Sequence, residues 1–362
     1  MALWNKENSR EGVSDKRNSF AGRLRELIVK GEYPPGAQLP TRRELATRFN
    51  TTLATMQVVF DRLLEEGFVE SSGRSGTFVS KTPPYLNHYG LVFPYQESRS
   101  QPWPIFWKAF AQEADRVGRE CGRRLTICYG NEGVGQHAVF EKTIEKVRNH
   151  HFGGLIFLTP PFLLGDTPLV SMPGLPRVML CDPMEGIPIP AIISASYPGK
   201  VLSYLASHGR KRAAVLTVPE LLEPTFVKGL PIVANRAGIS LPSYWQQTAN
   251  PFMPETARRC IQLLMRGSPQ ERPDGLFIMD DNFVEQATLG MLDAGLKVPE
   301  DVLVVAHGNY PLLPKTHVPV TWFGFDIPMI LRALIECLDK QCRGEIVEPF
   351  QVIEGERIEN LM

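Results

Sequence analysis

Residues 34–80, PPGAQLPTRRELATRFNTTLATMQVVFDRLLEEGFVESSGRSGTFVS, decide the fold of the first part of the chain. Thr41 and Glu44 have the three-residue spacing of a capping box, which predicts a helix starting directly after Thr41. A second helix is expected from about Thr52 to Gly67, after a short break. Its buried face would carry the apolar residues that recur at helical spacing: Met56, Val59, Phe60 and Leu63.

Two short β-prone runs follow these helices and are separated by the glycine-containing segment SGRS. Gly73 and Gly76 give this segment the freedom of a hairpin turn, so a two-stranded hairpin is expected. Upstream, residues 16–31 predict a further helix with an apolar stripe that includes Leu24 and Ile28. A helix, a helix-turn-helix and a hairpin, in this order, are typical of a winged helix. Such a fold places a helix in the major groove of DNA and a hairpin beside it.

The two motifs of this region carry a resemblance to a known family. The run PPGAQLPTRRELATRFNTT and the run LLEEGFVES with GTFV resemble the conserved segments of the GntR family of bacterial regulators. The resemblance covers residues 17–80 and implies DNA contacts at matching positions, namely Arg43, Thr52, Leu53, Ala54, Thr55, Gln57, Gly73, Arg74 and Ser75. Arg42 joins them on physical grounds, because an arginine beside a helix N-terminus is well placed to bind phosphate.

The chain departs from the family pattern at three of these positions. Leu53 and Gln57 stand where the family commonly has arginine, and Arg74 stands where glycine is common. Gln57 is suited to adenine and Leu53 to a thymine methyl group, so an operator unlike the usual one of the family is expected. Thr52 and Thr55 are also good capping residues, and this role can coexist with DNA contact.

From Tyr89 onward, short apolar runs alternate with amphipathic helical runs. The expected strands are YGLVF, LTICY, GLIFL, RVMLC, AAVLT, GLFIM and VLVV, and five helices are expected over residues 103–121, 138–150, 225–238, 254–267 and 281–296. Alternation of this kind predicts an α/β fold with doubly wound parallel sheets. For a segment of this length, two such sheets with a cleft between them are expected.

Three segments of this body resemble the effector domain of the LacI family, which is similar to periplasmic sugar-binding proteins. They are FGGLIFL, YLASHGRKRAAVLT and the long run that contains GLKVPEDVLVV. The resemblance implies two lobes joined by three crossovers, expected near 195–197, 320–324 and 341–346. Together with the N-terminal part, it is similar to the arabinose-repressor branch of GntR regulators. The expected parts are a flexible N-terminus (1–15), a winged helix-turn-helix (16–80), a linker (81–88) and the effector domain (89–362). Its lobe 1 would span about 89–195 plus 324–341, and lobe 2 about 197–320 plus 346–362.

An effector is expected between the lobes, at the carboxyl ends of the strands, as in open α/β sheets generally. The candidate ligand-binding residues follow expected strands or crossovers, and they are Trp103, Phe106, Asp182, Asp281, Asn309 and Trp322. Aromatic rings stack on the apolar faces of sugars, and carboxylates and amides bind hydroxyl groups. The aromatic residues Trp103 and Phe106 could equally be core residues at the start of a helix.

The sugar-binding pattern of the LacI family is incomplete in this chain. Its arginine falls on Phe226, and the usual aspartate after the VPEDVLVV block falls on Gly308 unless Asn309 replaces it. The aspartate after the fourth strand falls on Cys181 or, with a slip of one residue, on Asp182. The effector could therefore be an unusual sugar or another small molecule, or it could have been lost.

Composition and the absence of certain motifs help to distinguish between the possible classes of protein. The chain carries 39 basic and 39 acidic residues in total, while residues 1–82 hold 13 basic against 10 acidic ones, a small bias toward a polyanion-binding N-terminal part. The six scattered cysteines form no CxxC pair, so no metal site is expected. No catalytic motif, cofactor, secretory signal or membrane span is visible, which favours a cytoplasmic regulator over an enzyme.

The expected function is a transcription regulator, with repression as the expected mode, that acts as a homodimer on a palindromic double-stranded operator and responds to a small, sugar-like molecule. Two alternatives remain open. One is a GntR-type head on an aminotransferase-like body with pyridoxal phosphate. The other is a solute-binding protein with a vestigial head.

Overall fold

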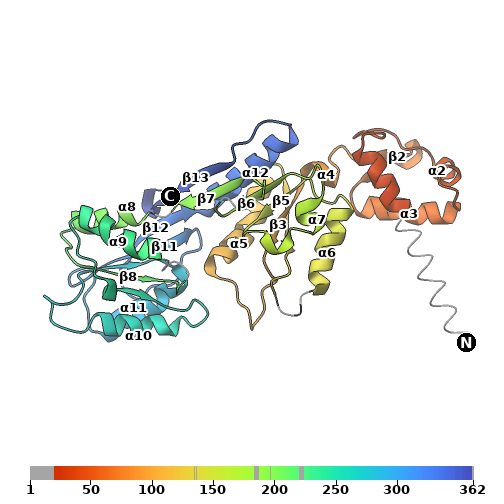
Figure 1. The fold of residues 1–362 in the computed structure, drawn as a ribbon. Helices are drawn as coiled ribbons and strands as arrows, with labels where there is room; N and C mark the ends of the chain where they lie inside the picture. Colours follow the sequence, from red (N-terminus) through yellow and green to blue (C-terminus); the bar gives the residue numbers. More distant parts are fainter. Residues whose placement is uncertain are drawn as a thin grey trace, which may run out of the picture.

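The computed structural model describes residues 20–133, 135, 137–182, 187–195, 197–219 and 224–360. Three parts lie in a row in Figure 1: a small N-terminal head, a first lobe and a second lobe. The fold class predicted from the sequence is confirmed, since a helix-turn-helix head precedes two sheets that are parallel apart from one short edge strand.

The head is formed by three helices and a hairpin. Its helices are residues 20–29, α2 (Arg42–Arg48) and α3 (Leu53–Glu65), and its hairpin strands are β1 (Val69–Ser71) and β2 (Thr77–Val79). The capping box is confirmed: the Glu44 amide donates to Thr41 Oγ1 (3.3 Å), and Glu44 accepts from the Thr41 amide (2.7 Å). Asn50 takes a left-handed conformation (φ 51°) in the turn between α2 and α3. The predicted stripe of α3 is buried in the core of the head.

The expected linker is structured. Residues 81–83 lead into the short helix α4 (Pro84–Asn87), and His88 already begins the first strand of lobe 1. This helix packs tightly, because a Cβ on Gly153 would lie 2.6 Å from the Tyr85 carbonyl oxygen. The head is therefore connected to lobe 1 by a packed segment of the chain.

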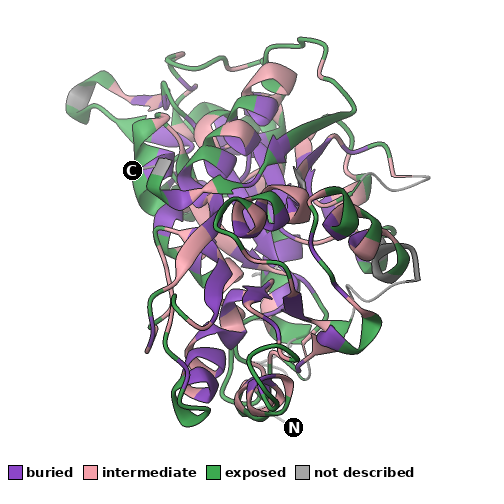
Figure 2. Ribbon diagram, turned by 90° about the vertical axis from the view of Figure 1, so that its left-hand side faces the viewer, coloured by how far each residue is buried: buried purple, intermediate pink, exposed green. Residues whose placement is uncertain are grey.

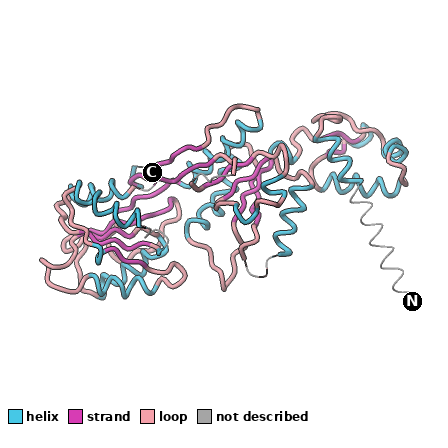
Figure 3. Tube along the Cα trace, viewed as in Figure 1, coloured by secondary structure: helices cyan, strands magenta, loops and turns pink. Residues whose placement is uncertain are grey.

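Lobe 1 contains one parallel sheet with the strand order β13-β7-β6-β5-β3-β4. The strands are β3 (His88–Phe93), β4 (Arg124–Tyr129), β5 (Gly154–Phe157), β6 (Arg177–Leu180), β7 (Ala191–Ala195) and β13 (Phe350–Glu354). Its helices are α5 (Ile105–Glu120), α6 (His137–Arg148), α7 (Pro168–Ser171) and α12 (Ile327–Cys342). Strand residues of both lobes are mainly buried, and helices cover them (Figures 2 and 3).

Lobe 2 contains the second sheet, with the order β14-β12-β11-β10-β8-β9. The strands are β8 (Ala213–Thr217), β9 (Gln246–Thr248), β10 (Gly275–Ile278), β11 (Leu303–Tyr310), β12 (Thr321–Asp326) and β14 (Glu356–Arg357). Its helices are α8 (Pro198–Ser207), α9 (Pro224–Arg236), α10 (Glu255–Leu264) and α11 (Val284–Asp293). Only β14 is antiparallel to its neighbour within this sheet.

The chain passes between the lobes three times. The first passage joins β7 to α8 through Tyr197, where it was expected. The second lies at Asp326–Ile327 and the third at Gly355, whereas the sequence placed them near 320–324 and 341–346. The lobe boundaries shift accordingly. Residues 320–324 lie mostly within β12 of lobe 2, and residues 341–346 lie at the end of α12 and directly after it, within lobe 1.

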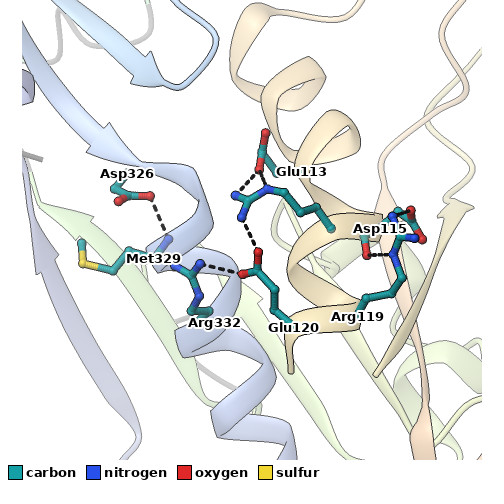
Figure 4. A network of polar contacts seen from close by, with 8 residues as sticks. Glu113, Asp115, Arg119, Glu120, Asp326, Met329 and Arg332 are labelled. Atoms are coloured by element: carbon teal, nitrogen blue, oxygen red, sulfur yellow. Dashed lines mark hydrogen bonds and ion pairs between the residues drawn. The ribbon is translucent and has the colours of Figure 1, made fainter. Parts of the chain in front are cut away.

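Polar contacts fix the start of α12 beside α5 (Figure 4). Asp326 caps α12 by accepting from the Met329 amide at 3.0 Å. Arg332 donates to Glu120 of α5 at 2.8 Å, and Glu120 also accepts from Arg116 at 2.6 Å. The second passage therefore enters a helix that is held firmly in lobe 1. Within the described residues, the structure has no helix that is long and apolar enough to cross a membrane.

Candidate functional site

The N-terminal half of α3 presents an exposed face on the head. Thr52, Leu53, Ala54 and Gln57 are exposed, with Leu53 at 52% of its full accessibility, while Thr55 is half-buried. Met56 and Val59 on the opposite face are buried in the core of the head. Leu53 and Val58 of the same helix are two of several exposed large apolar side chains in the described part of the chain, so exposure alone does not set Leu53 apart.

The polar groups on this face already have local partners. Thr52 Oγ1 accepts from the Thr55 amide at 3.1 Å and lies 2.9 Å from Thr55 Oγ1, so the predicted capping role of Thr52 is confirmed. Gln57 Nε2 donates to Asp61 Oδ1 at 2.8 Å, one helical turn away. The amide still has a second N–H and its oxygen, but a bidentate contact with adenine would compete with this bond for the orientation of the side chain.

The two arginines at the start of α2 lie in different surroundings. Arg43 is exposed. Arg42 is half-buried, and its guanidinium carbon lies 4.8 Å from the centroid of the Phe60 ring. Arg42 therefore contributes to packing against α3, and Arg43 is the more accessible of the two for a phosphate.

The hairpin tip lies at the end of the head. Gly73 and Ser75 are exposed, and residues 73–75 form a 3-10 turn with Gly73 at φ 50°. Gln38 Nε2 donates to the Ser75 carbonyl at 2.8 Å, which braces the hairpin against the segment before α2. The side chain of Arg74 lies outside the described part of the chain.

The second candidate site lies where the lobes face each other. Asp281, directly after β10, and Asn309, in β11, are both buried, and Asn309 Nδ2 donates to Asp281 Oδ2 at 2.7 Å. Burial, reinforced by the charge of Asp280, raises the pKa of Asp281 to about 8. The fold thus brings together two of the residues that were expected to bind a ligand, and their ligand-binding role stays a prediction.

The facing edges of the lobes touch near this pair. The amide of Ile105, at the start of α5 in lobe 1, donates to Asn282 Oδ1 of lobe 2 at 3.1 Å. Asn282 is in turn held by Asp280, which accepts from its side-chain amide at 2.8 Å. The carboxyl ends of the two sheets are therefore joined by a direct bond beside Asp281.

The remaining candidates of this site have mixed placements. Trp103 is buried, stacks on Phe93 with ring centroids 4.2 Å apart, and donates from Nε1 to the Tyr95 carbonyl at 3.0 Å, so its ring and N–H have partners inside lobe 1. Phe106 is half-buried and packs edge-on against Phe110. Asp182 is exposed after β6, and Trp322 is half-buried in β12.

Sequence patterns did not indicate the hydrogen-bonded pair of Tyr197 and His307 at the first passage between the lobes. The buried Tyr197 hydroxyl donates to the Phe323 carbonyl at 2.9 Å and also bonds His307 Nδ1. A hydroxyl has one proton, so donation to the carbonyl requires His307 to carry its proton on Nδ1. Burial lowers the pKa of His307 to about 4, which keeps this imidazole neutral. The only available signal was the position of Tyr197 in an expected crossover.

All three passages meet at Tyr197. A Cβ on Gly355, at the third passage, would overlap the Tyr197 ring, and Phe325, next to the second, packs edge-on against it with centroids 5.6 Å apart. Lys200 of α8 binds the same third passage through the Gly355 carbonyl (3.1 Å). Tyr197 and its surroundings therefore link all three connections between the lobes.

Two family models match separate parts of the chain. Residues 16–79 match the bacterial regulatory proteins of the gntR family, and residues 202–358 match a periplasmic binding protein-like domain. Neither alternative considered from the sequence, the aminotransferase-like body or the vestigial head, finds support in these matches.

One relative matches most of the chain, and another matches only a short part of it. The arabinose metabolism transcriptional repressor of Geobacillus stearothermophilus is 22% identical over 88% of this chain and 91% of its own length. The mannosyl-D-glycerate transport/metabolism system repressor MngR of Escherichia coli K12 is 39% identical, over 17% of this chain and 26% of its own length. The match thus spans about a quarter of that second relative.

A solved structure supports the architecture of the body. A regulatory protein of the LacI family from Chloroflexus aggregans superimposes with a TM-score of 0.59 at 15% identity, over 75% of this chain and 96% of its own length. At this identity the likeness concerns the fold alone, and it supports the two-lobed architecture of the body.

Proposed function

The chain joins a gntR-family helix-turn-helix domain to a periplasmic-binding-protein-like domain, and from this premise we propose that it is a transcriptional repressor controlled by a small molecule. The observation that carries the proposal is the exposed N-terminal face of α3 beside the hairpin, on a head attached to a two-lobed body. In this proposal the body binds its effector and catalyses no reaction. The repressor of arabinose metabolism that matches most of the chain supports the same function.

Operator recognition would use a small number of side chains on α3. Leu53 would contact a thymine methyl, and Gln57 would bind adenine after leaving Asp61. Arg43 would bind a backbone phosphate, and the hairpin tip would approach the neighbouring groove. We propose further that two copies of the chain, acting in the cytoplasm, place one head on each half of a palindromic operator.

The experiment that tests this function is a selection of bound DNA from a random duplex pool, using the full-length protein. We expect a palindromic site. Gln57→Ala should weaken its binding by about 1–3 kcal/mol, mainly by relaxing the preference at one base pair. Arg43→Ala should weaken binding to all sequences and reduce the salt dependence.

A matched control for the lost charge is Arg266→Ala, since Arg266 is also exposed but lies in lobe 2. This control should bind the selected duplex as the unchanged protein does. If the pool yields no enriched sequence at moderate salt, or if the control weakens binding as much as Arg43→Ala, the proposed mode of DNA binding is wrong.

The effector would be a neutral sugar-like molecule bound between the lobes near Asp281 and Asn309. We expect one member of a panel of free pentoses and hexoses to raise the midpoint of thermal unfolding, because a ligand at about 100 times its Kd stabilises by about 2.7 kcal/mol. Asp182→Ala should reduce this shift, whereas Asp115→Ala, at an exposed carboxylate on α5, should retain it. A shift that appears only with sugar phosphates would contradict a neutral ligand.

A further inference from the structure

The end of α3 that is farthest from the exposed recognition face contacts lobe 1. Glu66 follows α3 directly and accepts from Arg25 Nη1 at 2.6 Å and from Arg62 Nε at 2.8 Å. Arg25 lies in the first helix of the head and also donates from Nη2 to Asn149 Oδ1 of lobe 1 at 2.8 Å. One guanidinium therefore bonds the recognition helix and the body at the same time.

We call Arg25, Arg62, Glu66, Asn149 and His151 the docking cluster. Its centre is closed to solvent, since Arg25 is only 1% exposed. His151 Nε2 lies 3.7 Å from Glu66 Oε1, so a second body residue reaches the same carboxylate. Burial alone would raise the pKa of Glu66, but the nearby His151, the hydrogen bond from Arg62 and the charge of Arg25 lower it to about 2. The carboxylate is thus ionised and held by both domains.

Aromatic packing surrounds the docking cluster. The buried Phe68 ring lies 5.8 Å from the His151 ring, edge to face, and 6.3 Å from the Tyr85 ring of α4. The Arg25 guanidinium carbon lies 6.0 Å from the centre of the same Phe68 ring. Since head, linker and lobe 1 all contribute to this packing, the head is seated on lobe 1 in one orientation.

Helix α6 connects this cluster to the edge of lobe 1 that faces lobe 2. It starts after β4, whose carboxyl end lies at the edge where Ile105 bonds Asn282, and it ends at Arg148, directly before Asn149. Twelve helical residues span about 18 Å, enough to cross the lobe. Phe140, Ile144 and Val147 of α6 are buried in the core of lobe 1, so the helix moves with the sheet it covers. Figure 1 shows α6 between that sheet and the head.

We propose that the docking cluster couples the body of this protein to its head. In this proposal, a displacement of the edge of lobe 1 that faces lobe 2 moves α6, and α6 moves the recognition helix α3 through the docking cluster. The proposal rests on the proposed function, since it assumes that the head binds DNA and that the body binds an effector. Arg25 and Glu66 belong to the head, so their pair survives if the body contacts are removed. Asn149 and His151 are the body residues that contact Arg25 and Glu66, and Glu145 of α6 adds an ion pair with Arg62 at 3.7 Å. In this proposal Asn149 and His151 determine whether the head follows lobe 1.

The test uses the reciprocity of coupling: if the body controls DNA binding, then bound DNA must alter the body. The full-length protein is measured with and without the duplex recovered in the selection, by hydrogen exchange of amides in residues 137–151. In the unchanged protein, we expect the duplex to slow exchange in this segment by about fivefold or more. In Asn149→Ala/His151→Ala we expect the duplex to slow exchange in this segment no longer. The affinity of this variant for the duplex should change by a smaller factor than the exchange rates do.

Two further variants control for local damage. Asn149→Asp, made in the original protein, retains an acceptor for Arg25. This variant should keep the duplex-dependent slowing of exchange, whereas a variant whose lobe is merely destabilised would lose it. Asn235→Ala/His208→Ala removes the same two residue types from exposed positions in lobe 2 and should leave the change intact.

The outcomes separate this proposal from the proposed function. If no duplex is enriched, the DNA-binding function fails and the coupling proposal fails with it. If a duplex binds but residues 137–151 exchange unchanged in the original protein, only the coupling proposal is overturned. It is also overturned if the double variant at 149 and 151 keeps the full duplex-dependent change.

Discussion

Replacing Gly324 by alanine is expected to lower the free energy of unfolding by about 3–5 kcal/mol, the range of severe core damage. Gly324 of β12 lies opposite Gly308 of β11 in the parallel pair of strands. A Cβ on Gly324 would overlap the Gly308 carbonyl oxygen, which is backbone and cannot rotate away. The strands must therefore separate, and the backbone hydrogen bonds around this point are weakened.

The matched control is the same substitution at Gly229 of α9, in the same lobe. No heavy atom lies within 4 Å of a Cβ at this position, and alanine favours a helix over glycine by about 1 kcal/mol. Urea unfolding of the two variants should therefore move the transition in opposite directions. Similar losses in both would mean that lobe 2 tolerates no added methyl group and that the close approach of β11 and β12 is not the cause.

Replacing Asp281 by asparagine is expected to stabilise the protein at alkaline pH. The pKa of Asp281 is raised to about 8 in the folded protein, so the folded state keeps a proton that the unfolded state loses above about pH 4. The stability that this proton contributes is fully present below the unfolded pKa and is lost as the pH rises toward 8. Asparagine does not titrate and still offers an oxygen to Asn309.

Urea unfolding at pH 5 and at pH 8.5 measures this effect. The two proteins should differ little at pH 5, and the variant should be more stable at pH 8.5, by an amount of the order of 3 kcal/mol. Asp293→Asn is the control, because this exposed carboxylate of lobe 2 binds Arg258, which contributes to lowering its pKa. It should gain no stability at pH 8.5. A stability difference for Asp281→Asn that is independent of pH would show that the folded protein does not hold the proton.

The head could be predicted closely from sequence because its signals are local. The capping box at Thr41, the stop at Gly67 and the helical spacing of apolar residues each depend on a few neighbouring residues. The seven apolar runs expected as strands are likewise strands in the structure. Six of them shift by at most one residue at their ends, whereas β11 continues five residues beyond the expected run, to Tyr310. Buried parallel strands give this strong signal because both of their faces are apolar.

The passages between the lobes were harder to place. β13 joins lobe 1 and β14 joins lobe 2, yet only Gly355 separates them. Sequence pattern indicates that a segment is extended, but the sheet it joins depends on partners that are distant along the chain. The 16-residue helix α12 was also not recognised, and this error moved the third expected passage to the helix end.

The docking residues were missed for a different reason. An arginine within an amphipathic helix is expected to be solvated, and Arg25 is among the largest fully buried side chains of the protein. Its burial depends on Glu66 and Asn149, which are 41 and 124 residues away. Trp103 illustrates the opposite case, since the sequence left open whether it binds ligand or packs, and the structure places it against Phe93.

The interleaved lobes have a consequence for the order in which the protein can be made. Lobe 1 takes its last helix and its edge strand β13 from residues 327–354, after every strand of lobe 2 except β14 has been synthesised. The head is contiguous and can fold as soon as it leaves the ribosome, since domains generally fold in order of synthesis. The first five strands of lobe 1 must wait, with the buried face of α12 missing, until nearly the entire chain has emerged. A nascent chain truncated before residue 327 would thus display a formed head on an apolar, incomplete lobe, which is a substrate for chaperones.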